Sequence, residues 1–286
     1  MTTPAYFVSR ARDNVSCVIF ASPHSGRTYE ASFLERTLLN ELQIRSSEDA
    51  FVDQLFDCAP EFGALFLKAV APRAFIDLNR SADELDPALI EGVRRQGHNP
   101  RVASGLGVIP RVVANGRAIY RGKITRAEAD RRIDAYWRPY HRMLRTLLTE
   151  AYEVHGQAVL IDCHSMPHEA MNGMARSGMR RPDVVLGDRF GAAAGEEIVD
   201  EVEAAFVSAG FVVARNTPFA GAFVTQAYGR PGIGQHAVQV EIDRALYMDE
   251  TLIVPNRRFD DVKRTLRRVI CDIAMIGRTK MPLAAE

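Results

Sequence analysis

Two histidines stand where a folded chain could present them to a single metal ion. His24 follows the apolar run 17–21, His164 follows the apolar run 158–163, and a serine comes directly after each histidine. Neutral imidazole is a common ligand of Zn²⁺, and a catalytic zinc site needs three protein ligands and one open position. Taken alone, a histidine at a strand end is more often a hydrogen-bonding residue, and the HExxH motif of many metalloproteases is absent.

A single glutamate interrupts an otherwise apolar alternating segment near the end of the chain. Glu241 lies within the segment 238–242, between Val240 and Ile242. A partly buried carboxylate holds its proton more tightly, which suits a general base that takes a proton from an activated water. The alternative is a structural ion pair between Glu241 and Arg244.

A third polar group closes the segment 74–80. Arg80 could grip a carboxylate with two parallel hydrogen bonds, and Asn79 would add a neutral donor. The alternative is a surface ion pair with Asp83 or Glu84.

Farther upstream, three aspartates recur every four residues and would share one face of a helix. The three are Asp49, Asp53 and Asp57. For Asp49 and Asp57, a solvent-exposed face is the simpler interpretation.

The elements that must position these side chains alternate between strand-like and helix-like patterns. This alternation predicts an α/β fold, a mixed sheet covered by helices on both faces, and chemistry at the carboxyl ends of strands. The predicted strands are 17–21, 74–78, 158–163, 183–186, 211–214 and 236–242. The predicted helices are one capped by Ser46 or Ser47, one from Thr125 to Gly156 with a capping box and an interruption at Pro139, then 195–209 and 257–276. The segment 166–182 is predicted to be a long loop.

Composition narrows the class of protein. The 286 residues include 36 Lys and Arg against 36 Asp and Glu, a balance that argues against a nucleic-acid partner. No apolar run approaches the roughly 20 residues that span a bilayer, and no signal peptide is visible. The four cysteines are widely spaced and we expect them to be reduced, in a cytoplasmic protein. A homo-oligomer is left open.

Taken together, many of these stretches resemble the N-formylglutamate amidohydrolase family, from about residue 17 to residue 250. The matching segments are SPHSGRTY (22–29), EDAFVDQLF (48–56), APRAFIDLNRSADELDP (71–87), GLGVIPRVV (105–113), AIYRGKIT (118–125), PYH (139–141), LIDCHSMP (160–167), VVLGDRFG (184–191), NTPFAGAFVTQAYG (216–229) and QVEIDRALYMDE (239–250). We expect a single domain over 1–286, with the C-terminal helix at about 257–276 that the amphipathic pattern predicts. The resemblance implies a three-layer αβα fold with a mixed central sheet, phosphorylase/hydrolase-like, as in zinc carboxypeptidases.

The resemblance assigns a metal to the two histidines. The family is distantly similar to zinc carboxypeptidases and aspartoacylases, in which a His-x-x-Glu pair and a later histidine hold Zn²⁺. His24 and His164 match the two histidines, whereas Arg27 occupies the glutamate position. We therefore expect Asp53, in the matching segment 48–56, to be the third ligand.

Further roles follow from the same resemblance. The stretch 73–80 is similar to one in aspartoacylases, where a leading arginine polarises the scissile carbonyl and a closing Asn-Arg pair binds a substrate carboxylate. These roles fall on Arg73, Asn79 and Arg80, and Glu241 matches the glutamate that acts as general base and then general acid. A second substrate carboxylate would need another cation, for which the candidates are Arg111, Arg121 and Arg244.

The implied reaction is zinc-dependent removal of the formyl group from N-formyl-L-glutamate, which gives formate and L-glutamate at the end of histidine degradation. Two alternatives stay open. One is an amidohydrolase for another N-acyl or N-formyl amino acid. The other is a metal-free, non-catalytic binding protein on the same fold, for which Arg27 at the ligand position is the argument.

Overall fold

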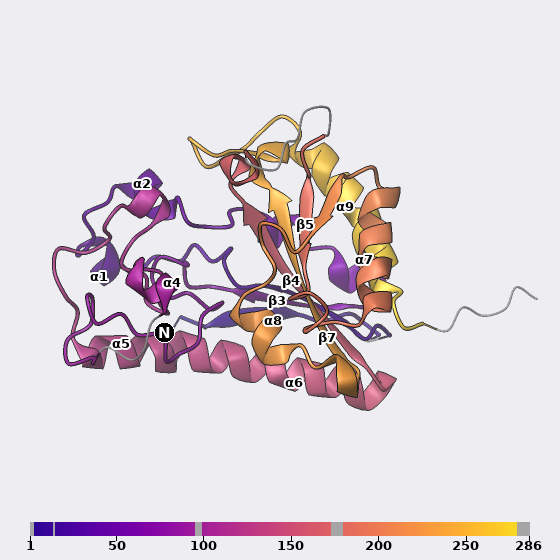
Figure 1. The fold of residues 1–286 in the computed structure, drawn as a ribbon, viewed down its shortest axis with the longest axis horizontal. Coiled ribbons are helices and arrows are strands. Elements are labelled where there is room, and N and C mark those ends of the chain that lie inside the picture. The colour runs from indigo at the N-terminus through magenta and orange to yellow at the C-terminus, as the bar shows by residue number, and fades with distance from the viewer. Residues whose placement is uncertain (1–2, 14, 95–98, 173–179, 279–286) are drawn as a thin grey trace, which may run out of the picture.

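A mixed sheet of seven strands forms the centre of the computed structural model, which describes residues 3–13, 15–94, 99–172 and 180–278 (Figure 1). The strand order across the sheet is β1-β3-β2-β4-β7-β5-β6, and β3, β2, β4 and β7 run parallel to one another. The edge strand β1 is antiparallel to β3, and the β5–β6 pair is antiparallel to β7. The strands are β1 (Tyr6–Ser9), β2 (Val18–Ser22), β3 (Leu65–Ala69), β4 (Ala158–Met166), β5 (Val184–Gly187), β6 (Val213–Arg215) and β7 (Gln235–Asp243), with a separate hairpin of β8 (Met248–Asp249) and β9 (Val254–Pro255).

Helices cover both faces of this sheet because its buried strands carry apolar side chains on both sides. In β4, Val159 and Ile161 pack with α7 and α9 in one hydrophobic core, whereas Ala158 and Leu160 pack with α6 in the other. Figure 1 shows α6 on one side of the sheet and α7 and α9 on the other. The predicted three-layer α/β fold is therefore confirmed.

The longer helices lie close to the predicted positions. They are α6 (Arg138–His155), α7 (Glu196–Ser208) and α9 (Phe259–Ala274). The shorter ones are α1 (Ala31–Leu34), α2 (Glu41–Arg45), α3 (Val52–Leu55), α4 (Pro100–Ala103), α5 (Arg126–Arg132) and α8 (Phe223–Tyr228), with 3₁₀ turns at Ala59–Phe62, Ala114–Gly116, His168–Met171, Pro231–Ile233 and Arg244–Leu246. A π-helical turn, Ile133–Trp137, joins α5 to α6. None of the described helices is long and apolar enough to cross a membrane.

Two predicted elements are wrong in the segments that lead to the site. The segment 74–78 is not a strand: Phe75 and Ile76 donate backbone hydrogen bonds back to Pro72, so the chain turns there, and the strand is β3 instead. The helix after Ser46 is also absent, because Asn40 caps the short α2 and only one turn of α3 follows. Part of the predicted loop, 173–179, lies outside the described residues.

The helix from Thr125 begins as predicted but with half of the capping box. The Thr125 hydroxyl accepts a hydrogen bond from the Glu128 backbone amide. The Glu128 carboxylate, however, is bound by Arg131 and by Arg132 rather than by the capping amide. The interruption expected at Pro139 is present as the π-helical turn, which lies just before the proline.

Candidate metal centre and active site

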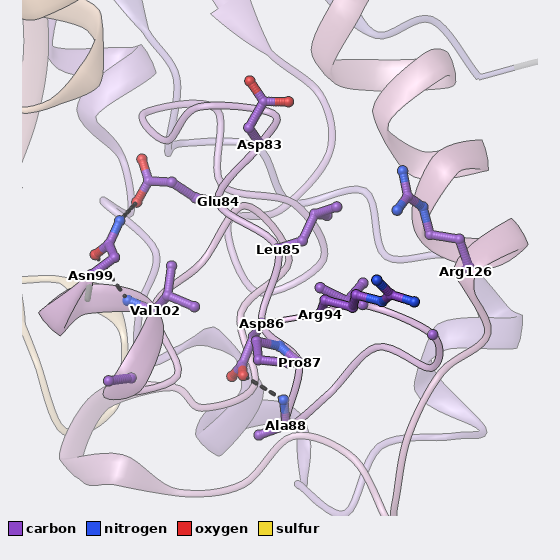
Figure 2. A pocket seen from close by; sticks show the side chains of 13 residues that line it. Asp83, Glu84, Leu85, Asp86, Pro87, Ala88, Arg94, Asn99, Val102 and Arg126 are labelled. Atoms are coloured by element: carbon purple, nitrogen blue, oxygen red, sulfur yellow. Dashed lines mark hydrogen bonds between the residues drawn. The ribbon is translucent and has the colours of Figure 1, made fainter. Parts of the chain in front are cut away.

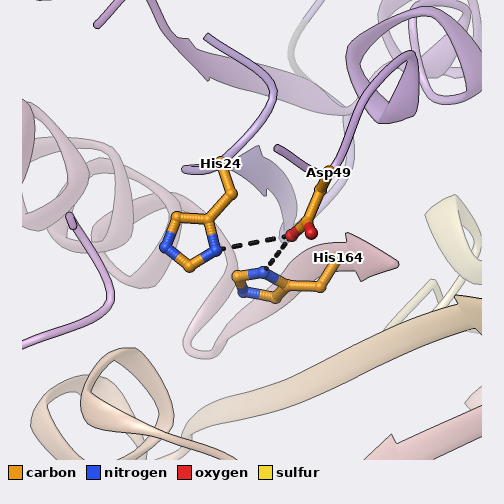
Figure 3. Close-up of side chains that lie close together, drawn as sticks. All are labelled: His24, Asp49 and His164. Carbon is orange, nitrogen blue, oxygen red and sulfur yellow. Dashed lines mark hydrogen bonds and ion pairs between the residues drawn. The ribbon is translucent and has the colours of Figure 1, made fainter. Parts of the chain in front are cut away.

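His24, Asp49 and His164 converge at the carboxyl ends of two neighbouring parallel strands (Figure 3). His24 comes two residues after β2, and His164 lies near the end of β4. Asp49 lies in the turn before α3, where its backbone amide donates to the His24 carbonyl at 3.0 Å. One ligand atom from each side chain lies within 4.8 Å of the others, and all three residues are buried. Two segments far apart in the sequence thus meet around one carboxylate.

Both imidazole rings turn the same nitrogen towards that carboxylate. Asp49 Oδ2 lies 2.9 Å from Nδ1 of His164 and 3.4 Å from Nδ1 of His24. The opposite nitrogens face other carboxylates: Nε2 of His24 is 2.7 Å from Asp77 Oδ1, and Nε2 of His164 is 2.9 Å from Asp162 Oδ2. A carboxylate that accepts the Nε2 proton leaves the Nδ1 lone pair free, which is how histidine ligands of metals are usually held.

This arrangement fits a divalent cation. No described residue makes a hydrogen bond with the buried Nδ1 of His24. When Nε2 donates its proton to Asp77, Nδ1 presents a lone pair to an oxygen of Asp49, and a cation between the two atoms would stabilise this arrangement. Two imidazole nitrogens and a carboxylate oxygen form a donor set typical of Zn²⁺.

The electrostatics of the cluster also favour positive charge. Burial alone would raise the pKa of the Asp49 carboxyl, but His164 and His24 outweigh burial and hold the pKa well below its usual range. Burial alone would lower the pKa of His164, but Asp162 and Asp49 outweigh it and raise that pKa well above its usual value. Carboxylates that stabilise a proton on an imidazole would equally stabilise a metal cation in its place.

The structure places Asp49, and not Asp53, beside the two histidines. Asp53 lies away from the two histidines and pairs with Arg27, whose Nη1 is 3.0 Å from Asp53 Oδ1. The reason is that residues 49–57 do not form one helix: Phe51 adopts a left-handed conformation (φ 67°), so Asp49 and Asp53 do not share a helical face. Asp49 is 1% exposed and so does not belong to a solvent-exposed helix face. The one signal in the sequence that pointed to Asp49 was its position in the segment 48–56, which matches the family.

Glu241 lies beside this cluster, as its position in the sequence predicted. It stands opposite His164 in the register of β4 and β7, and its Oε1 accepts a hydrogen bond from Gln239 Nε2 at 2.8 Å. Burial raises the pKa of Glu241 to about 7, even though His164, Arg73 and Arg244 act in the opposite direction. A carboxyl with that pKa can both accept and return a proton near neutral pH.

Arg73 and Asp77 form a pair at the edge of the cluster. Arg73 Nε donates to Asp77 Oδ2 at 3.1 Å, while the other oxygen of Asp77 holds His24. Burial alone would raise the pKa of Asp77, but His24, Arg73 and Arg80 outweigh it and keep the carboxylate ionised. Asp77, for which the sequence suggested no role, therefore links the candidate metal cluster to Arg73.

Asn79 and Arg80 come directly after this pair, and both are buried. The Asn79 amide is engaged within the chain, since its Oδ1 accepts from the Val224 backbone amide at 2.8 Å. Arg80 donates through Nε to the Leu106 carbonyl and through Nη1 to the Asn79 carbonyl, and no described residue accepts a hydrogen bond from its Nη2. Arg80 therefore keeps a donor for a ligand, whereas Asn79 acts mainly within the protein.

The three further arginines have different places. Arg244 lies against the cluster and donates to Asp49 Oδ1 at 2.9 Å and to Ser165 Oγ at 3.1 Å, so it orients the carboxylate. Arg111 pairs with Asp86 at 2.8 Å. Arg121 is exposed, and no hydrogen bond or ion pair joins it to the described residues of the cluster. Of these three arginines, the structure thus brings only Arg244 to the candidate metal centre.

A separate cavity of about 780 Å³ opens beside the residues that follow Arg80 (Figure 2). Its walls carry charges of both signs, including Glu84, Asp86, Arg94 and Arg126. None of the three clustered residues lines it, so this cavity contributes no ligand to the candidate metal centre.

Comparisons with known proteins agree on one family. A family model described as N-formylglutamate amidohydrolase matches residues 16–248. N-formylglutamate deformylases from Pseudomonas aeruginosa and Pseudomonas putida are 31% and 29% identical over 241 residues, which cover 82% of each chain. The crystal structure of N-formylglutamate amidohydrolase from Ralstonia eutropha JMP134 has a TM-score of 0.89 at 34% identity, covering 96% of this chain and 99% of that one. A protein from Agrobacterium tumefaciens shares the fold at 17% identity and a TM-score of 0.63, over 95% of both chains.

Proposed function

Because this chain belongs to the N-formylglutamate amidohydrolase family, we propose that it hydrolyses N-formyl-L-glutamate to formate and L-glutamate. The observation that carries the proposal is the convergence of two imidazole Nδ1 atoms on Asp49 Oδ2, with Glu241 on the neighbouring strand. This arrangement provides a cation site and a proton acceptor side by side, which hydrolysis of an amide requires. A place at the end of histidine degradation stays an expectation from the resemblance.

The proposed cofactor is Zn²⁺, held by His24, Asp49 and His164. When bound there, the ion would activate a water molecule and polarise the formyl carbonyl. Asp77 and Asp162 would keep the two rings in the tautomer that binds metal, and Arg244 would fix the ligand carboxylate through its other oxygen. These neighbouring residues would thus fix the orientation of the two rings and of the ligand carboxylate.

Glu241 is the proposed general base and then general acid. Its carboxylate takes a proton from the attacking water and returns that proton to the departing amine nitrogen. Gln239 holds one carboxylate oxygen and thereby fixes the orientation of the group. A pKa of about 7, caused by burial, makes both proton transfers accessible near neutral pH.

Two arginines are proposed to bind the substrate. Arg73 is held through Nε by Asp77, and no described residue accepts a hydrogen bond from its two terminal nitrogens, so these can stabilise the negative charge that develops on the formyl oxygen. Arg80, with its unengaged Nη2, can bind a substrate carboxylate. Both arginines remain charged at any relevant pH, which suits these roles.

The direct experiment combines metal analysis with an assay of formate release. Purified protein should contain close to one zinc ion per chain and should release formate from N-formyl-L-glutamate in preference to the N-formyl derivatives of L-aspartate and L-methionine. A faster rate on another formyl amino acid would move the proposal to a different substrate. A protein that binds no zinc and releases no formate after zinc is added would overturn it.

A further inference from the structure

Three side chains from one helical segment each donate a hydrogen bond to a carbonyl of the segment 75–80. Arg132 Nη1 donates to the Phe75 carbonyl at 3.2 Å and Trp137 Nε1 to the Arg80 carbonyl at 2.8 Å. His141 Nε2 lies 2.9 Å from the Leu78 carbonyl, and because a carbonyl can only accept, Nε2 carries the proton. Segment 75–80 carries Asp77, the partner of His24, and ends on Arg80, so these donors hold the backbone of the substrate-binding side.

The donors face one way because of the π-helical turn Ile133–Trp137. In a regular α-helix, residues five apart point about 140° away from each other. In a π turn the backbone bond runs from residue i+5 to residue i, as it does here from the Arg138 amide to the Ile133 carbonyl, so residues five apart point towards the same side of the helix. This turn brings Trp137 onto the same side as Arg132, and His141 follows one α-helical turn later.

Pro139 accounts for the position of this turn. Proline has no backbone N–H, and its ring crowds the carbonyl four residues earlier, so an unbroken α-helix through Pro139 would be strained. The wider turn lies directly before it, between α5 and α6. The three aligned side chains are also fixed by packing. Arg132 and His141 are buried, and the Trp137 ring lies 4.0 Å, centroid to centroid, from that of His141.

We propose that the π-helical turn is a positioning device for substrate binding, and that Trp137 is the positioning residue that sets the Arg80 guanidinium. Trp137 touches neither the metal cluster nor the reacting atoms; it acts by holding the Arg80 main chain. The Arg80 side chain donates hydrogen bonds to the Leu106 and Asn79 carbonyls, which leaves its Nη2 for the ligand. The inference rests on the proposed function only in taking a carboxylate of the substrate as that ligand.

Trp137→Phe tests the proposal because it keeps an aromatic ring against His141 and removes the Nε1 donor, together with part of the ring volume. We expect the KM for N-formyl-L-glutamate, and the Kd for L-glutamate measured by calorimetry on the zinc-loaded protein, to rise about three- to tenfold, the usual effect of one lost hydrogen bond. The kcat should change by less than about twofold, because the metal cluster and Glu241 are untouched.

Tyr136→Phe is the matched control. Tyr136 lies in the same turn and also loses one donor, but its hydroxyl binds Glu30 at 2.7 Å instead of the segment 75–80. It should leave both KM and the Kd of L-glutamate unchanged. In an Arg80→Lys background, where the aligned guanidinium is gone, Trp137→Phe should add no further loss of affinity, since the two changes act on the same contact.

Three results would overturn the proposal. The first is that Trp137→Phe lowers the affinity for L-glutamate equally in the wild-type and Arg80→Lys backgrounds. The second is that Trp137→Phe lowers kcat and Tm while KM and Kd stay unchanged. The third is that the wild type binds L-glutamate no more tightly than Arg80→Lys does. Failure of the proposed function would be seen separately, as a wild-type protein that releases no formate, because the binding measurement needs no turnover.

Discussion

Glu241 lies directly opposite His164 on the neighbouring parallel strand, so the proposed general base and a proposed metal ligand are set by the same strand register. A shift of one residue would turn one of the two side chains to the other face of the sheet. The nine-residue pairing of β4 with β7 makes such a shift costly, since both strands are buried almost throughout. The relative placement of Glu241 and His164 is thus set at the centre of the sheet.

Replacing Glu241 with Gln should separate catalysis from metal binding. Gln keeps the size of the side chain and can still accept the hydrogen bond from Gln239, but it cannot take a proton. Formate release should fall at least about a hundredfold, while zinc per chain, measured by elemental analysis, should stay at the wild-type value. An unchanged rate would remove Glu241 from the mechanism.

Asp49→Asn and Asp53→Asn form a matched pair of variants from one segment. Asp49 faces both imidazoles, whereas Asp53 pairs with Arg27. Asp49→Asn should weaken zinc binding by more than the roughly ten- to hundredfold loss typical of an outer-shell partner. Asp53→Asn should leave zinc affinity near the wild-type value. Competition with a fluorescent chelator measures both, and the reverse order of affinities would restore Asp53 as the ligand.

Metal removal should also lower stability, because the proposed site would bind zinc in the folded protein, whereas the unfolded chain does not hold the ligands together. At free zinc a hundred times above Kd, the gain is about 2.7 kcal/mol, so adding a chelator should lower Tm by several degrees. The His164→Ala variant lacks one ligand and should show little of this shift. Differential scanning calorimetry with and without chelator gives the comparison, and equal shifts in both proteins would argue against the assigned site.

The sequence places His24, His164 and Glu241 at or near the ends of apolar runs, and in the structure these runs form the central strands β2, β4 and β7. Their proposed roles came from the family resemblance, since the pattern alone favours no ligand. Sequence reasoning missed Asp49 because aspartates spaced four residues apart suggest a continuous helix. The left-handed conformation of Phe51 interrupts that helix, and the hydrophobic periodicity does not reveal it. The segment 74–78 was taken for a strand because apolar residues are buried in turns as well as in sheets. The turn there is fixed by contacts with Arg132 and His141, far along the chain, which no local pattern reveals.

The sequence could not distinguish among the arginines for the same reason, because it does not show which residues each arginine contacts in the fold. Their charge marks them as partners for a carboxylate, but the sequence does not say whether that carboxylate belongs to a substrate or to the protein. In the structure Arg244 binds Asp49 and Arg111 binds Asp86, so both are engaged by aspartates well away in sequence. Arg80 differs from these two arginines because its side chain donates hydrogen bonds to backbone carbonyls and not to an aspartate.

His141 should make stability fall in mild acid. Burial lowers its pKa to about 3, with a smaller contribution from Arg145, although the hydrogen bond to Leu78 acts in the opposite direction. In the unfolded chain a histidine takes up a proton below about pH 6.5, whereas folded His141 does not until about pH 3. Protons therefore favour the unfolded state over this interval, and its contribution to stability is complete above pH 6.5 and is lost at about 1.4 kcal/mol per pH unit below it.

Urea unfolding of the wild type and of His141→Gln between pH 5 and pH 8 tests this. The Gln side chain can still donate to the Leu78 carbonyl but does not titrate, so the variant should lose less stability on acidification. A chelator in both samples keeps zinc release at low pH out of the comparison. Because Tyr228 faces the other ring nitrogen of His141 at 2.8 Å and stays neutral throughout this range, the difference between the two slopes reports the histidine alone. Parallel slopes for the two proteins would show that His141 takes up its proton in the folded state as readily as in the unfolded one.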